Sequence, residues 1–104
     1  EVVSGIAVMT DGAKGSLVSD GRYIYRASIF KEKVLVDRTG AGDAFAAGFV
    51  IGMIQKNDVH YAMRYGAANA TSVVEHIGAQ AGILKKGAIN DKRWRYLDLD
   101  IEPL

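Results

Sequence analysis

The stretch that decides the fold is residues 37–49, which read Asp37-Arg38-Thr39-Gly40-Ala41-Gly42-Asp43-Ala44-Phe45-Ala46-Ala47-Gly48-Phe49. Its first half predicts a loop of small residues. From Ala44 to Ile54 almost every residue is apolar and compatible with a helix. A helix that is apolar all round is expected to be buried. Gly48 and Gly52 lower helix propensity, so we expect them to let another backbone approach closely.

The start of this helix is physically suited to hold an anion. The first turn of a helix has free N–H groups and a partial positive charge, and the small residues Gly40, Ala41 and Gly42 leave room for a phosphate. Asp43 needs a separate reason, because a carboxylate beside a bound phosphate is repulsive. Two reasons remain open from the residues alone. Asp43 favours the first helical turn electrostatically, or it takes a proton from an attacking hydroxyl while the amides stabilise a transferring phosphoryl group.

The residues before this stretch predict short strands and tight turns. The pattern gives a buried strand over Ile6–Thr10 ended by Asp11-Gly12, a strand over 16–18, a hairpin turn at Asp20-Gly21, a half-buried strand over 22–26 and a fourth strand over 33–36.

The residues after it predict a second helix and a short tail. Asn57-Asp58 is expected to cap an amphipathic helix of about five turns that runs to Ile77. Gly78 is a natural end for that helix. Asn69 is expected at the surface or in helix packing. The tail predicts a short helix over 92–96 with a packed Trp94, and an edge strand over 97–101.

Length and composition bound the function. The chain has 104 residues, which suffices for one small domain. Thirteen Lys and Arg nearly balance twelve Asp and Glu, so charge gives no argument for binding nucleic acid or an anionic membrane. There is no cysteine, which excludes disulfides and thiolate metal sites. The apolar run is shorter than the ~20 residues that span a membrane. A cytoplasmic enzyme is the simplest interpretation. Because the chain opens without methionine into an apolar run, we expect a fragment, a processed chain or a sequence that lacks its beginning.

Residues 37–49 closely resemble the C-terminal signature of the ribokinase-like, or PfkB, carbohydrate kinases. The resemblance implies an α/β fold in which residues 1–104 form the C-terminal, nucleotide-binding part of a three-layer sandwich, a single incomplete domain with two helices packed on the sheet. Two further segments support it. Thr10-Asp11-Gly12-Ala13-Lys14-Gly15 is similar to the family's T-x-G-x-x-G strand end, and Gly78-Ala79 is similar to its second nucleotide loop.

The resemblance also implies roles for particular residues. Asp43 corresponds to the catalytic base, and the amides of Gly40, Ala41 and Gly42 correspond to the anion hole. The implied cofactors are ATP, Mg²⁺ and, in some members, K⁺. The nucleotide-binding positions are Thr10, Gly12, Gly15, Gly42, Gly78 and Ala79, and the monovalent-cation positions are Asp37 and Thr39. Two positions depart from the family pattern: Arg38 replaces a small or hydroxyl residue, and Ala67 stands where many members have Asn or His.

The expected function is ATP-dependent phosphorylation of a hydroxyl on a sugar, nucleoside or related small molecule. The 104-residue chain by itself is expected to be inactive, because the family holds its acceptor pocket in the N-terminal part. An open sheet edge predicts a homo-oligomer or a partner chain that covers it. Two alternatives remain: a non-catalytic nucleotide-binding or self-associating module, and a structural α/β fragment without a ligand.

Overall fold

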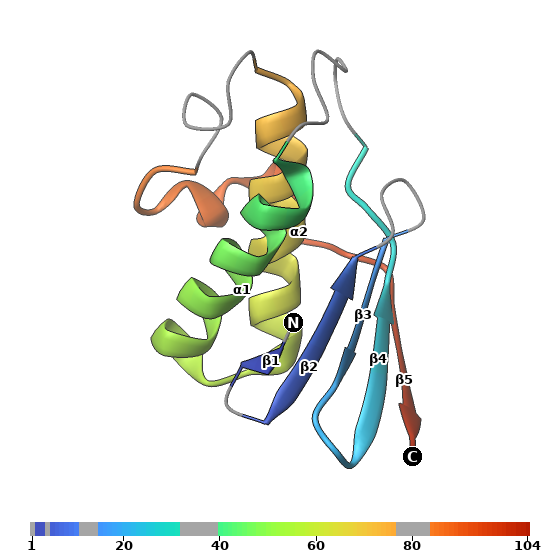
Figure 1. Cartoon of the computed structure of the whole chain (residues 1–104). Coiled ribbons are helices and arrows are strands. Elements are labelled where there is room, and N and C mark those ends of the chain that lie inside the picture. Colours follow the sequence, from blue (N-terminus) through green and yellow to red (C-terminus); the bar gives the residue numbers. More distant parts are fainter. Residues whose placement is uncertain (1, 4, 11–14, 32–39, 77–83) are drawn as a thin grey trace.

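The computed structural model of the chain describes residues 2–3, 5–10, 15–31, 40–76 and 84–104. Its strands are β1 (Val2–Val3), β2 (Ile6–Thr10), β3 (Ser16–Ser19), β4 (Tyr23–Ala27) and β5 (Leu99–Pro103). Its helices are α1 (Ala41–Lys56) and α2 (Val59–Val74), with two short 3-10 helices, η2 (Ala88–Asn90) and η3 (Lys92–Trp94). Figure 1 shows α1 and α2 together on one face of the sheet. The described part is therefore an α/β unit with one helical layer on a sheet.

The sheet is antiparallel between all neighbouring strands and follows the chain order β1-β2-β3-β4-β5. The predicted hairpin turn is confirmed. The Asp20 carboxylate accepts the N–H groups of Arg22 at 2.9 Å and Tyr23 at 2.8 Å, and Gly21 has a φ of +90°, which glycine adopts without strain. The edge strand predicted over 97–101 is confirmed as β5, but it begins two residues later, at Leu99, and ends at Pro103. The predicted strand over 33–36 lies outside the described residues.

The prediction that β2 is buried along its length is wrong. Only Val8 is buried, whereas Met9 is 64% exposed. Successive side chains of a strand point to opposite faces, and the described helices α1 and α2 lie on one face of the sheet. Val8, with Val18 opposite it on β3, packs in the core cluster beneath the helices. Met9 belongs to the other face.

The prediction that α1 is buried all round is also wrong. Its buried residues are Ala44, Phe45, Gly48, Phe49 and Gly52. They repeat at intervals of three and four, which is one face of a helix. On the opposite side Ile54 is 80% exposed.

Two glycines of α1 let α2 approach closely, as predicted. A Cβ atom added to Gly48 would lie 2.9 Å from the Cα of Gly66, and one added to Gly52 would lie 2.6 Å from the Cα of Ala62. Cβ atoms do not approach backbone so closely without displacement. The missing side chains therefore set the distance between the two helices.

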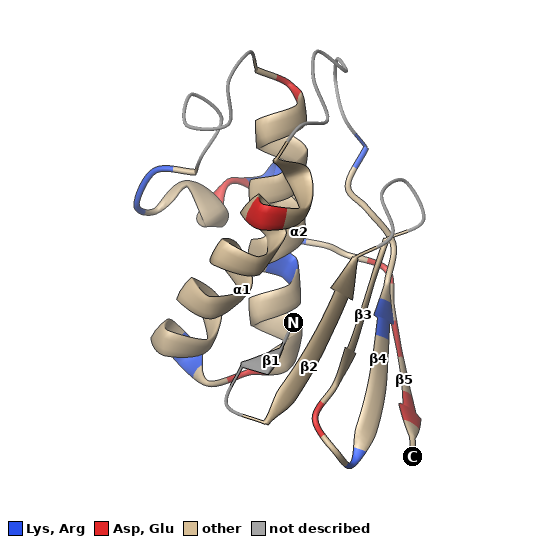
Figure 2. Ribbon diagram, in the orientation of Figure 1, with Lys and Arg blue, Asp and Glu red and all other residues tan. Residues whose placement is uncertain are grey.

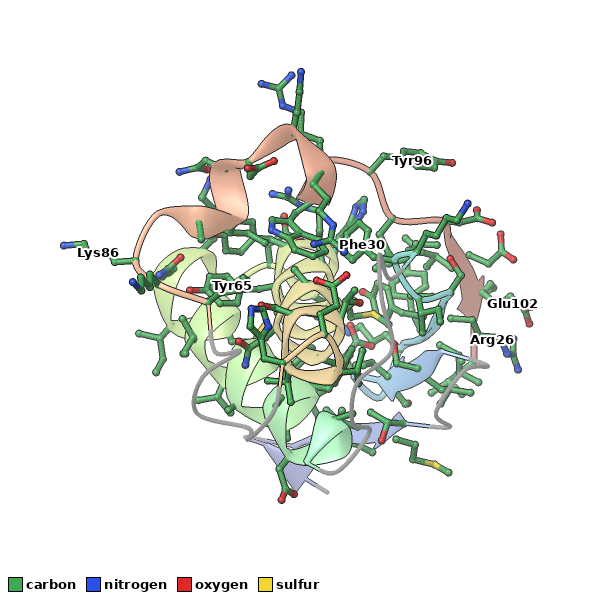
Figure 3. All side chains as sticks on the ribbon, turned by 90° about the horizontal axis from the view of Figure 1, so that it is seen from above. Arg26, Phe30, Tyr65, Lys86, Tyr96 and Glu102 are labelled. Carbon is green, nitrogen blue, oxygen red and sulfur yellow. The ribbon has the colours of Figure 1, made fainter. Side chains whose placement is uncertain are left out.

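The second helix begins as predicted and ends earlier. Asp58 is its N-cap, and its carboxylate accepts the N–H of His60 at 2.9 Å. The helix ends at Val74 with Glu75 as its C-cap, while Ile77 and Gly78 lie outside the described residues. Figure 3 shows α2 in the middle of the molecule, surrounded by α1, the sheet and the C-terminal segment. For this reason it is buried on more faces than an amphipathic helix would be.

The C-terminal segment covers α2 from the side away from the sheet. The guanidinium of Arg64 donates a hydrogen bond to the carbonyl of Trp94 at 2.7 Å. The buried Trp94 ring packs edge to face on the Phe30 ring, with 5.1 Å between the ring centroids. Figure 2 shows basic and acidic residues interspersed over the described chain rather than gathered on one side. Among the described residues, no helix combines the length and the apolar character needed to cross a membrane.

Candidate functional site

The first turn of α1 presents backbone N–H groups that the helix does not use. Gly40 is the N-cap, with a φ of 83°, and no side chain caps this end. The first helical hydrogen bond runs from the Ala44 N–H to the Gly40 carbonyl at 2.8 Å. The N–H groups of Ala41, Gly42 and Asp43 precede it and have no acceptor within the helix. Together with the partial positive charge of a helix start, they form a position that attracts an anion.

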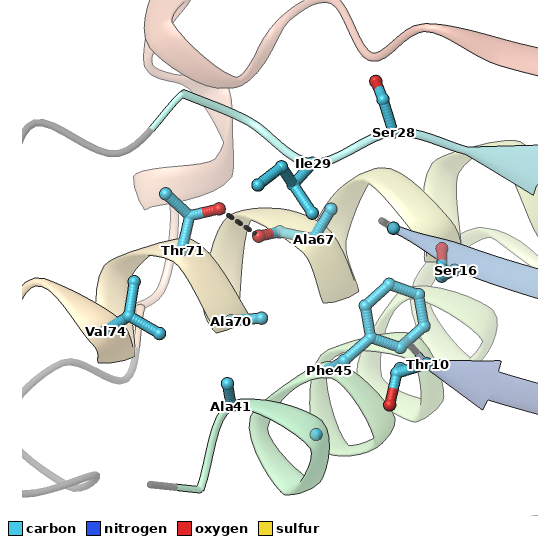
Figure 4. A pocket seen from close by; sticks show the side chains of 12 residues that line it. Thr10, Ser16, Ser28, Ile29, Ala41, Phe45, Ala67, Ala70, Thr71 and Val74 are labelled. Carbon is cyan, nitrogen blue, oxygen red and sulfur yellow. Dashed lines mark hydrogen bonds between the residues drawn. The ribbon is translucent and has the colours of Figure 1, made fainter. Parts of the chain in front are cut away.

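A cavity of about 200 Å³ opens between this helix start, the sheet and α2. Figure 4 shows its walls. The described residues that line it are Thr10, Gly15, Ser16, Ser28, Ile29, Ala41, Gly42, Phe45, Ala67, Ala70, Thr71 and Val74. None of these side chains carries a charge. The cavity is thus an apolar slot with a few hydroxyl groups, open at one place to the amides of α1.

The structure brings four of the predicted site residues to this one cavity. Thr10 ends β2, Gly15 precedes β3, and Ala41 and Gly42 begin α1, yet all four line it. Gly15 has a φ of +104°, and a Cβ atom there would lie 2.0 Å from the Ala27 carbonyl oxygen. No other residue fits at this position without moving the end of β4.

Asp43 lies beside the cavity and not in its wall. Its side chain is exposed, and it is not among the described residues that line the cavity. The neighbouring Ala41 and Gly42 do line it. Two chemically different groups therefore meet at the first turn of α1: the small residues Ala41 and Gly42 line the cavity, and the exposed Asp43 carboxylate does not.

Several predicted site residues lie outside the described part of the chain. They are Gly12, Asp37, Thr39, Gly78 and Ala79, and with them Arg38. Their roles stay predictions. Within the described residues no cluster of three or more His, Asp or Glu side chains is placed to hold a metal ion.

The sequence left two positions open for Asn69, at the surface or in helix packing. The structure shows helix packing. It is 2% exposed. Its side-chain amide donates to the Ala44 carbonyl at 2.8 Å, and its oxygen accepts the N–H of Leu84 at 2.9 Å. A signal for this was present, because Asn69 stands three residues after Gly66 and shares its helix face toward α1.

The sequence also did not predict that Ser16 and Thr71 line the cavity. The Ser16 side chain is buried, and its hydroxyl has no hydrogen-bond partner. By contrast, the Thr71 hydroxyl in the same cavity donates to the Ala67 carbonyl at 2.8 Å. No sequence motif points to Ser16, because its position in the cavity depends on the pairing of β3 with β2 and β4.

Comparison with known proteins shows which protein family the sequence resembles. The model of the pfkB family of carbohydrate kinases matches residues 2–86. The chain is 36% identical over 78 residues to 5-dehydro-2-deoxygluconokinase of Bacillus subtilis, covering 73% of this chain and 24% of that protein. It is 38% identical over 71 residues to fructosamine kinase FrlD of Bacillus subtilis, covering 68% of this chain and 25% of that protein. It is 38% identical over 74 residues to cytidine kinase of Thermococcus kodakarensis, covering 70% of this chain and 27% of that protein. The chain thus spans about a quarter of the length of these relatives.

Two solved structures share the arrangement of strands and helices. The nucleoside kinase of Methanocaldococcus jannaschii, described as an archaeal member of the ribokinase family, superposes with a TM-score of 0.78 at 28% identity, over 88% of this chain and 31% of that one. Arabidopsis thaliana ribokinase, complexed with ribose and ATP, superposes with a TM-score of 0.78 at 28% identity, over 88% of this chain and 30% of that one. The described α/β unit is a part of the ribokinase fold.

Proposed function

The chain belongs to the pfkB family of carbohydrate kinases, and we propose that it supplies the nucleotide-binding part of an ATP-dependent kinase for a hydroxyl group of a sugar or related small molecule. One observation carries the proposal. The uncapped start of α1 opens into the same cavity as Thr10 and Gly15, which come from distant parts of the sequence. An anion site joined to an apolar slot suits a nucleotide, which is a polyphosphate attached to a flat ring system.

The residues of the described site fit ATP better than they fit a metal ion. The free amides of α1 would bind phosphate oxygens, and the apolar walls would receive the nucleoside. The described lining holds no carboxylate, and the described residues hold no metal-ligating cluster. Mg²⁺ would therefore enter on the phosphates, which are its usual ligands in kinases, and we assign it no ligand here. K⁺ near Asp37 and Thr39 stays a proposal from the family resemblance.

Asp43 is the proposed general base. Its carboxylate is exposed one residue after Gly42, so it can meet an acceptor hydroxyl that approaches from outside the cavity. It would take the proton of that hydroxyl as the oxygen attacks the terminal phosphorus and ADP leaves. The amides of Gly40, Ala41 and Gly42 would stabilise the negative charge on the phosphoryl group during transfer.

The proposed acceptor is a sugar or a nucleoside. The relatives include kinases named for 5-dehydro-2-deoxygluconate, fructosamine and cytidine, which supports this range without selecting one member of it. Asp43 does not line the described cavity, so that cavity does not orient an acceptor at its carboxylate. Orientation of the acceptor is a large share of catalysis, so we propose that the 104-residue chain alone does not turn over.

A second candidate is a self-associating or partner-binding module. Exposed apolar side chains on two surfaces favour it: Ile54 of α1 is 80% exposed and Met9 of β2 is 64% exposed. Met9 lies on the face of the sheet that the described helices do not cover, and this face is available to another chain.

One experiment separates the two candidates. ATP is titrated into the 104-residue chain by calorimetry, and the chain is then assayed with ATP and a panel of sugars and nucleosides. Saturable ATP binding supports the nucleotide site, and product formation would show that the chain is a complete catalyst. Absence of ATP binding together with a concentration-dependent dimer would contradict the kinase proposal and favour the module.

A further inference from the structure

The Ser16 hydroxyl is the one buried side-chain polar group among the described residues that has no hydrogen-bond partner. The residue is 9% exposed and lines the cavity. A hydroxyl that is removed from water without a partner costs free energy. Such a group in a cavity wall therefore calls for an explanation other than packing.

Packing alone would be served better by alanine. In the sheet register Ser16 lies between Thr10 of β2 and Ala27 of β4, on the face that the helices cover. Ala27 occupies its position there with 5% exposure, so a methyl group is tolerated in this row of the sheet. The hydroxyl adds a donor and an acceptor that the folded chain does not use.

The position of Ser16 in the cavity indicates which part of a ligand it meets. Figure 4 shows Ser16 and Phe45 at the sheet end of the cavity and Thr71 and Val74 at the other end, while Ala41 marks the helix start. Phosphates bound to the amides of α1 leave the rest of the cavity to the nucleoside. Among the remaining described walls, most are apolar.

We propose that the Ser16 hydroxyl forms a hydrogen bond with the nucleoside part of the bound nucleotide. The inference rests on the proposed function, because it takes the phosphates to lie at the start of α1. The hydroxyl can rotate to donate or to accept, so it can serve either a ring nitrogen or a ribose hydroxyl. Binding then satisfies the group that the ligand-free protein leaves unpaired.

The test is Ser16→Ala in the 104-residue chain, with ATP and inorganic tripolyphosphate as probes in calorimetry. The affinity for ATP should fall about three- to tenfold, which is the effect of losing one hydrogen bond. The affinity for tripolyphosphate should not change, because this ligand has no nucleoside for the Ser16 hydroxyl to contact. The thermal midpoint without ligand should stay equal or rise, because the variant loses an unpaired buried hydroxyl.

Ser19→Ala is the matched control. Ser19 stands on the same strand, is half-buried, and is not among the described residues that line the cavity, so its loss should leave both affinities unchanged.

The outcomes separate two failures. If the parent chain binds ATP and Ser16→Ala binds it equally well, the inference is overturned and the proposed function survives. If Ser16→Ala lowers the affinities for ATP and tripolyphosphate alike, Ser16 does not contact the nucleoside. If the parent chain binds no ATP, the proposed function fails, and the inference fails with it.

Discussion

The side-chain amide of Asn69 on α2 donates a hydrogen bond to the carbonyl of Ala44 on α1, across a distance of 2.8 Å. The oxygen of the same amide accepts the N–H of Leu84. One buried side chain thus joins the first turns of α1, the middle of α2 and the segment that returns after residue 83. These contacts hold the start of α1 in its position at the cavity.

Replacing Asn69 with Leu should destabilise the protein. The variant keeps a similar volume but leaves the Leu84 N–H without its acceptor and removes the bond to Ala44, which costs about 1–3 kcal/mol of unfolding free energy. Urea denaturation measures the change. Asn90→Ala is the control, because Asn90 is exposed, and it should cost less than about 0.5 kcal/mol. Equal stability of the two variants would contradict the role given to Asn69.

Gly48→Ala should also destabilise the protein, by about 1–3 kcal/mol. The added Cβ would lie 2.9 Å from the Cα of Gly66, and this neighbour is backbone that cannot rotate away. Alanine has a higher helix propensity than glycine by ~1 kcal/mol. A measured loss of stability would therefore show that the clash between α1 and α2 outweighs the gain in helix propensity. A gain in the thermal midpoint would mean that the two helices do not pack as described.

Unlike Gly48→Ala, Gly42→Ala should not lower the stability of the protein, but it should strongly weaken ATP binding. Its Cβ would lie 3.4 Å from the Thr10 hydroxyl, an ordinary contact, so the helix should keep or gain up to ~1 kcal/mol. Because Gly42 and Thr10 both line the cavity, the methyl group takes up space that the phosphates need. The affinity for ATP should fall at least about tenfold in calorimetry. Unchanged affinity would remove Gly42 from the nucleotide site.

The hairpin turn should weaken in acid through Asp20. The N–H groups of Tyr23 and Arg22 bind the carboxylate and hold the pKa of Asp20 below its ordinary value. A lowered pKa in the folded state contributes stability that is present above the unfolded pKa and is lost as pH falls through the folded pKa. The stability difference between the parent and Asp20→Ala should therefore shrink as the pH falls below about 4, the ordinary pKa of an aspartate. A difference that does not change with pH in urea denaturation would contradict this.

The sequence predicted the features that depend on neighbouring residues. The turn at Asp20-Gly21, the cap at Asp58 and the close approach at Gly48 follow from local chemistry, and the structure confirms each. It did not predict which side chains of α1 and β2 are exposed, because burial depends on what covers a side chain. Ile54 is as apolar as its neighbours, yet no described element lies over it.

Polar residues in the core were the second gap. Nothing near Ser16 in the sequence shows that it faces a cavity, because this depends on strand register. For Asn69 the sequence left open whether the residue lies at the surface or packs against another helix, and the crossing of α1 with α2 decides it. The motif at residues 37–43 predicted the start of α1, where we propose that an anion binds. The residues that line the cavity beside this helix start could be identified only from the structure.

The central claim is that Asp43 is the base of a phosphoryl transfer, and Asp43→Asn tests it most directly. The variant is compared with its parent in a protein of the relatives' length that carries this chain, with ATP and the best acceptor of the sugar and nucleoside panel. Asp91→Asn, at another exposed acidic position, is the control. We expect Asp43→Asn to bind ATP as well as the parent and to lose at least about a hundredfold in kcat, as general-base removal does. A kcat within about tenfold of the parent would show that Asp43 is not the base.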